Sequence, residues 1–109
     1  GMSTPAGEAS AGPIREALKL VIDPELGYNI VDLGLVYDVA VQGAGDALIT
    51  MTTTTRGCPA TDYLRMGARD AAFSVDGIDS VEIILTYDPP WTPKMMSPEA
   101  KAHFRIRDE

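Results

Sequence analysis

The chain has a single cysteine, Cys58, among its 109 residues. One thiol excludes an internal disulfide, which agrees with a reducing compartment. Long apolar runs are also missing: none approaches the roughly 20 residues that a helix needs to cross a bilayer. A charged-then-apolar signal peptide is not seen either. These absences predict a cytoplasmic protein with no membrane partner.

Positive charge is scarce as well. Nine Lys and Arg stand against sixteen Asp and Glu, so the formal net charge is -7, and the basic residues are scattered along the chain. Proteins bind the phosphate backbone of nucleic acids through clustered Lys and Arg. We therefore expect no nucleic-acid partner.

The length fits one domain, and a hydrophobic fraction of 45% can fill a modest core. Gly1, which precedes Met2, looks like a cloning scar. The segment up to residue 12 is small and polar, which is typical of a disordered tail. We expect residues 1–12 to form this tail and residues 13–109 to form a single folded domain.

Hydrophobic spacing and turn residues predict the elements of this domain. They are a helix over 13–22, strands over 35–41 and 47–55, a helix over 60–74, a strand over 81–87 and a short helix capped by Ser97. The glycine-rich turn at 42–46 predicts that the first two strands pair antiparallel. The order predicts an α+β fold: a small two-layer sandwich with a mixed three-stranded sheet covered by helices on one face.

Cys58 lies at the junction between the threonine-rich strand and the following helix. Pro59 suits the first helical position, which would place Cys58 at the cap. There the positive end of the helix dipole lowers the pKa of a thiol, and the cation of Arg56 adds to that effect. The alternative is a buried structural cysteine. The flanking Gly57 and Pro59 favour a functional thiol.

Other polar residues are weaker candidates when each is taken alone. Asp23 and Glu25 flank a proline, and ordinary turn chemistry with a solvated carboxylate explains them. Thr54 and Thr55 immediately precede the cysteine loop, where their hydroxyls can hydrogen-bond a thiolate or orient the chain. The lone His103 is expected to be an exposed helical histidine rather than a base.

Four motifs in this order resemble the small iron–sulfur cluster assembly family that includes SufT and PaaD-type proteins. The motifs are Asp23-Pro24-Glu25, the stretch Asn29-Ile30-Val31-Asp32-Leu33-Gly34-Leu35-Val36, Gly57-Cys58-Pro59, and Asp88-Pro89-Pro90-Trp91-Thr92-Pro93 with Met96-Ser97. The likeness covers about Ile14 to Lys101. It implies an α+β sandwich and an accessory or targeting role in maturing iron–sulfur proteins, without enzymatic turnover.

The resemblance also implies roles for individual residues. Cys58 becomes the reactive or metal-ligating thiol. Asp23 and Glu25 match the acidic turn expected near that thiol, and Thr54 and Thr55 match the polar positions before it.

Two further residues match the family, and each has two possible roles. Asp32 either shapes its loop or contacts metal. Trp91 either packs over the site loop or meets a partner. Arg56 departs from the family, which often has a smaller or apolar residue at that position.

Iron–sulfur clusters normally take four ligands, so one Cys58 cannot hold a cluster alone. Three schemes remain open. A homodimer could bridge a cluster with two Cys58 thiolates, the protein could present a single thiolate transiently during transfer to a client, or it could recruit clients without holding a cluster. The implied cargo is an iron–sulfur cluster or iron, bound transiently. The implied partners are other iron–sulfur assembly proteins and client apoproteins.

Two other functions stay open. One is a PaaD-like maturation partner of a ring-oxygenating complex, although PaaD-type proteins often carry extra C-terminal cysteines that this chain lacks. The other is a metal-free thiol enzyme with Cys58 as nucleophile and Asp23, Glu25 or His103 as base.

Overall fold

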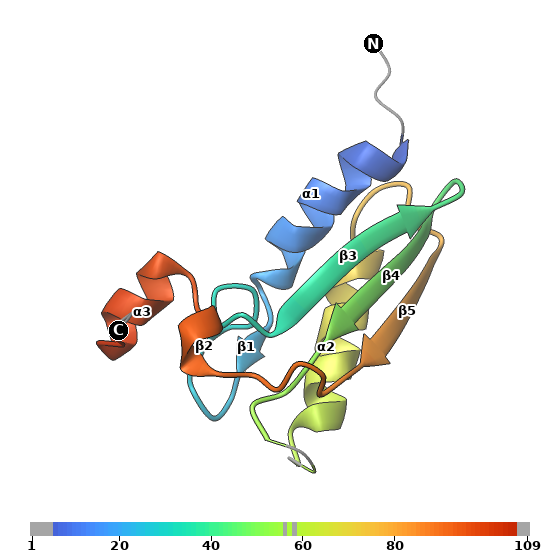
Figure 1. Ribbon diagram of the computed structural model, residues 1–109. Coiled ribbons are helices and arrows are strands. Elements are labelled where there is room, and N and C mark those ends of the chain that lie inside the picture. The colour runs from blue at the N-terminus through green and yellow to red at the C-terminus, as the bar shows by residue number, and fades with distance from the viewer. Residues whose placement is uncertain (1–5, 56, 58, 107–109) are drawn as a thin grey trace.

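The computed structural model describes residues 6–55, 57 and 59–106 (Figure 1). In chain order the elements are α1 (Ala6–Leu18), β1 (Ile22–Asp23), β2 (Tyr28–Asn29), β3 (Val36–Gln42), β4 (Asp46–Met51), α2 (Thr61–Phe73), β5 (Ser80–Leu85), the 3-10 turn η1 (Pro93–Met95) and α3 (Pro98–Phe104). The predicted order is present, with the small antiparallel pair β1–β2 added. The α+β prediction is confirmed.

The main sheet has the order β3-β4-β5. β3 pairs antiparallel with β4 through the predicted hairpin, and β5 pairs parallel with β4 after the α2 crossover. Along β4, side chains alternate between the two faces of the sheet. Ala47, Ile49 and Met51 are buried on the inner face. This alternation makes one face of the sheet the floor of the core.

The two long helices cover that inner face. α1 contacts β3 and α2, while α2 contacts β5; Figure 1 views the sheet from the opposite side. Apolar residues at helical spacing meet the sheet, among them Ile14 and Leu18 on α1 and Leu64 on α2, all fully buried. Burying a side chain of this size contributes about 1.5–3 kcal/mol. These stripes hold the two layers together.

The first helix differs from its predicted bounds at both ends. It begins at Ala6 rather than residue 13, with Pro13 inside it, so the expected disordered tail is wrong over residues 6–12. Three of these residues are alanine, which has the highest helix propensity of the amino acids, and the prediction gave this too little weight. The helix ends at Leu18, and Lys19 and Leu20 continue with tighter bonds to the carbonyls three residues earlier.

The strands also depart from the predicted pattern. A register shift between Val36 and Asp38 breaks the expected alternation, so Leu35 and Val36 are both buried and the Tyr37 hydroxyl reaches Pro89 O at 2.8 Å. β4 ends at Met51 rather than residue 55. Within the described part of the chain, no helix is both long and apolar enough to cross a membrane.

Candidate functional site

The acidic turn and the threonine loop meet in the structure. Asp23 is only 2% exposed, and its Oδ1 accepts backbone N–H bonds from Glu25 at 2.7 Å and Leu26 at 3.2 Å. The Asp23 carboxylate therefore builds the turn that follows β1. Glu25 is exposed, and its Oε1 accepts a hydrogen bond of 3.3 Å from Thr54 Oγ1. Glu25 thus reaches the segment that leads to Cys58.

The threonine segment leaves the sheet at its carboxyl end. Thr52 N–H donates to Leu35 O at 2.8 Å, and Thr52 and Thr53 are both buried. Thr53 Oγ1 donates to Thr55 O at 2.7 Å and lies 2.9 Å from the hydroxyl of Tyr87. The buried Thr53 hydroxyl therefore links the loop before the cysteine motif to Tyr87.

Tyr87 is a site residue that sequence reasoning missed. It follows β5, whose last residue Leu85 pairs with Met51 of β4. Parallel strands end at the same edge of a sheet, so residues after β5 lie beside those after β4. The predicted crossover between these strands was the signal that could have placed Tyr87 beside Thr53.

Cys58 and Arg56 lie outside the described residues, so their predicted roles stay predictions. Gly57 has φ +69°, a left-handed conformation that L side chains rarely adopt. α2 begins at Thr61 with Ala60 at its N-cap and no side-chain cap bond. The prediction that Pro59 opens this helix is therefore wrong, because the chain makes a further turn before the helix begins.

This shift weakens one sequence argument. Cys58 precedes the N-cap by two positions in the chain rather than occupying it. The field of a helix terminus falls off within its first turn. The prediction that a cap position lowers the pKa of the Cys58 thiol therefore loses its premise.

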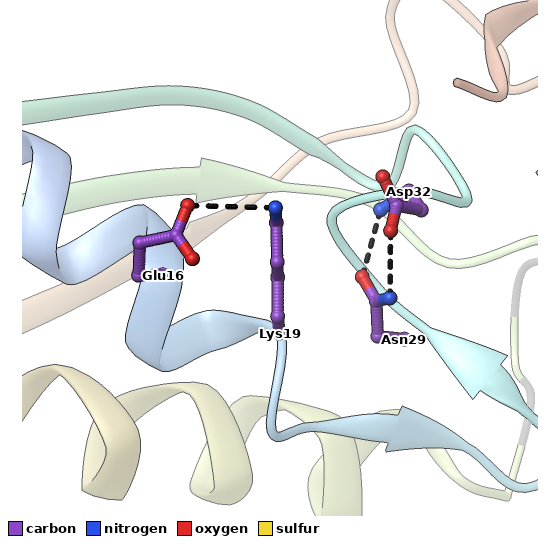
Figure 2. A network of polar contacts seen from close by, with 4 residues as sticks. All are labelled: Glu16, Lys19, Asn29 and Asp32. Carbon is purple, nitrogen blue, oxygen red and sulfur yellow. Dashed lines mark hydrogen bonds and ion pairs between the residues drawn. The ribbon is translucent and has the colours of Figure 1, made fainter. Parts of the chain in front are cut away.

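Asp32 is held within its own loop (Figure 2). Its Oδ2 accepts from the Asn29 amide and its backbone N–H donates to Asn29 Oδ1, both at 2.8 Å. Its carbonyl accepts from Ser97 N–H at 2.7 Å. These contacts give Asp32 a loop-shaping position between β2 and α3. Figure 2 also shows the exposed Glu16–Lys19 pair of α1, 3.4 Å apart.

Trp91 fastens the C-terminal segment to that same loop. Its indole N–H donates to Leu33 O at 2.7 Å, and its ring packs against the core. His103 lies in α3, where its ring centroid is 5.0 Å from that of Tyr28. This ring contact places His103 beside β2, where Tyr28 pairs with Asp23 of β1.

The described residues do not form a preassembled metal cage. Among residues 6–55, 57 and 59–106, no group of three or more His, Cys, Asp or Glu side chains is placed to hold a metal ion. Glu25 supplies a hard oxygen donor beside the loop, and Cys58 would supply a soft thiolate. Both are known donor types for iron.

The family model described as "Iron-sulfur cluster assembly protein" matches residues 13–84. The chain belongs to this family. The resemblance drawn from the four motifs is thereby confirmed. The match includes the acidic turn, the Asp32 loop and the cysteine motif.

Individual relatives carry related names. The Fe-S protein maturation auxiliary factor YitW of Bacillus subtilis is 42% identical over 92% of this chain and 98% of its own length. The auxiliary factor SufT of Staphylococcus aureus is 42% identical over 75% of this chain and 93% of its own. An Escherichia coli protein named as one component of a 1,2-phenylacetyl-CoA epoxidase is 39% identical over 81% of this chain but only 53% of its own.

A solved structure supports the fold. A domain of unknown function from Bacillus anthracis superimposes with a TM-score of 0.86 at 38% identity, over 93% of this chain and 96% of that one. This chain and that domain therefore share the two-layer sandwich.

Proposed function

We propose that this chain is an accessory factor in the maturation of iron–sulfur proteins, acting by binding and transfer rather than by turnover. Membership of the assembly family supports this role, as do the names of YitW and SufT. The observation that carries the proposal in the structure is the Thr54–Glu25 hydrogen bond. It brings the acidic turn to the loop of Cys58.

Cys58 is proposed to act as a thiolate that ligates iron or a cluster in transit. The cluster is cargo, because a cluster normally takes four ligands and this chain has one thiol. The remaining ligands would come from a second copy, a small thiol or the client apoprotein. Glu25 is proposed to lie within reach of the cargo as an oxygen donor. The partners are then iron–sulfur assembly proteins and client apoproteins.

The test is anaerobic reconstitution with iron and sulfide, followed by visible absorption and by iron and sulfide analysis per chain. Three proteins are compared: wild type, Cys58→Ser, and Cys58→Ser combined with Ala44→Cys. Ala44 is exposed in the β3–β4 hairpin, at the opposite end of β4 from the cysteine loop. The double variant therefore keeps the number of thiols but moves the thiol away from the proposed site.

The proposal predicts bound iron in wild type only. About one cluster per two chains would indicate a bridged dimer. Equal binding by the relocated thiol would contradict a specific site, and no binding by any of the three would contradict ligation by Cys58. Turnover of a thioester or peroxide by metal-free wild type, lost in Cys58→Ser, would favour the thiol enzyme instead.

The E. coli relative favours one second candidate, a maturation partner dedicated to a ring-oxygenating complex. This chain covers about half of that relative's length. Binding to such a complex with no transfer to general iron–sulfur clients would favour this candidate.

A further inference from the structure

A partly buried hydrogen-bond chain joins Tyr87, which follows β5, to the segment before Cys58. The Tyr87 hydroxyl lies 2.9 Å from Thr53 Oγ1, and Thr53 Oγ1 lies 2.7 Å from Thr55 O. Thr53 is 2% exposed. We propose that Tyr87, acting through Thr53, is a positioning residue that anchors the segment 53–55 before Cys58 and thereby sets the reactivity of the thiol. This inference rests on the proposed role of Cys58.

The direction of the protons follows from elementary chemistry. A threonine hydroxyl has one hydrogen, and a carbonyl oxygen can only accept. Thr53 therefore gives its hydrogen to Thr55 O, and Tyr87 must donate to Thr53. Hydrogen bonds linked in this way polarise one another, and a partner lost from a buried member leaves an unsatisfied group. The chain thus works as a unit that needs both hydroxyls.

The position of the chain explains what it controls. Thr55 lies three residues before Cys58, and fixing its carbonyl orients the peptide plane that leads into residue 56. Thr54 is held from another element, through Glu25 of the acidic turn. Consecutive residues are therefore anchored from two sides, one from β5 and one from β1. Past them, Gly57 adopts its left-handed conformation. A loop held in this way loses less conformational entropy when it meets its cargo.

The experiment measures the alkylation rate of the single thiol by iodoacetamide as a function of pH. The variants Tyr87→Phe and Thr53→Val remove one hydroxyl each, and Thr53→Ser keeps the hydroxyl. Tyr63→Phe is the control, because Tyr63 is 59% exposed on α2. Unfolding midpoints in urea are measured for every variant, so that a folding defect is recognised.

We expect Tyr87→Phe and Thr53→Val to change the alkylation rate at neutral pH by about threefold to tenfold, the range for one lost hydrogen bond. Thr53→Ser and Tyr63→Phe should match wild type. The double variant Tyr87→Phe/Thr53→Val should be no worse than either single variant, because both break one chain. An unchanged alkylation profile in folded Tyr87→Phe would overturn the inference.

The two proposals fail separately. Absence of bound iron in the reconstitution contradicts ligation by Cys58, whereas alkylation of the thiol needs no iron. A wild-type midpoint at or above the ordinary thiol value of about 8.5 contradicts only the lowered thiolate pKa that Cys58 was predicted to have. The limiting rate at high pH, where every thiol is ionised, then reports loop geometry alone. A difference in that rate between wild type and Tyr87→Phe still supports positioning by Tyr87, and equality overturns it.

Discussion

Thr54 Oγ1 donates to Glu25 Oε1 at 3.3 Å, joining two loops that are 29 residues apart in the chain. The contact is exposed, so its own contribution to stability is small. Its importance is spatial, because it places a carboxylate beside the loop of the only thiol. An acidic turn that looks ordinary in the sequence is thereby part of the candidate site.

Replacing Asp23 should destabilise the turn that carries Glu25. Asp23→Ala removes a buried acceptor of two backbone N–H bonds, and we expect a loss of about 3 kcal/mol in the free energy of unfolding. Asp23→Asn keeps an oxygen at the same position and should lose less. Urea unfolding followed by circular dichroism measures both, and equal losses would contradict the role of the acceptor oxygen.

Two glycines in the left-handed region form a matched pair. Gly27 has φ +70° with open space around it, whereas a Cβ on Gly34, φ +82°, would collide with the backbone carbonyl of Met95. Gly27→Ala should cost about 1 kcal/mol from backbone strain alone. Gly34→Ala should cost about 3 kcal/mol, because overpacking adds to the strain. Similar unfolding midpoints for the two variants would argue against the close approach of Met95.

Trp91→Phe should loosen the C-terminal segment from the loop between β2 and β3. The substitution removes the N–H donor and leaves Leu33 O without this bond, at a cost of about 1–3 kcal/mol. Tyr63→Phe, on the exposed face of α2, should stay within about 0.5 kcal/mol of wild type. Denaturant unfolding compares the two, and a Trp91→Phe protein as stable as the control would contradict the fastening role.

The Tyr37 phenol should make the free energy of unfolding fall at alkaline pH. Burial raises the pKa of its phenol above the ordinary value, although a hydrogen bond with Thr52 opposes this. The neutral phenol is therefore favoured in the folded state. Its stabilising effect is fully present below the unfolded pKa of about 10 and is lost as pH rises through the folded pKa.

The measurement is the free energy of unfolding of wild type and Tyr37→Phe between about pH 8 and pH 11, a range that brackets phenol ionisation. The difference between the two proteins should shrink as pH rises. A constant difference across this range would show that the Tyr37 phenol does not titrate differently in the two states.

Much of the fold could be predicted because its signals are local. The buried stripe of α2 and the hairpin turn at 42–46 set the helix and the antiparallel strand pair, and Ser97 caps α3 as predicted, with its Oγ accepting from Ala100 N–H at 3.2 Å. The bulge after Val36 was missed because no turn or spacing signal in the sequence marks it, and the hydrogen bond of the neighbouring Tyr37 goes to Pro89, 52 residues away.

The candidate site was predicted only in part. The motifs identified the acidic turn and the threonines, but their contact depends on how β1 and the loop after β4 meet in space. Tyr87 had no motif of its own and required the parallel pairing of β5 with β4. The N-cap of α2 was misplaced because Pro59 suits either a first helical position or the turn before it.

Trp91 is the only tryptophan in the chain, and its indole N–H is bonded to Leu33 O across 58 residues. Intrinsic fluorescence excited through tryptophan therefore comes from a single junction, where the C-terminal segment meets the loop between β2 and β3. The wavelength of maximum emission of Trp91 reports on hydration at that junction without any attached dye. Trp91 is thus an intrinsic fluorescent probe for partners or cargo that disturb this junction.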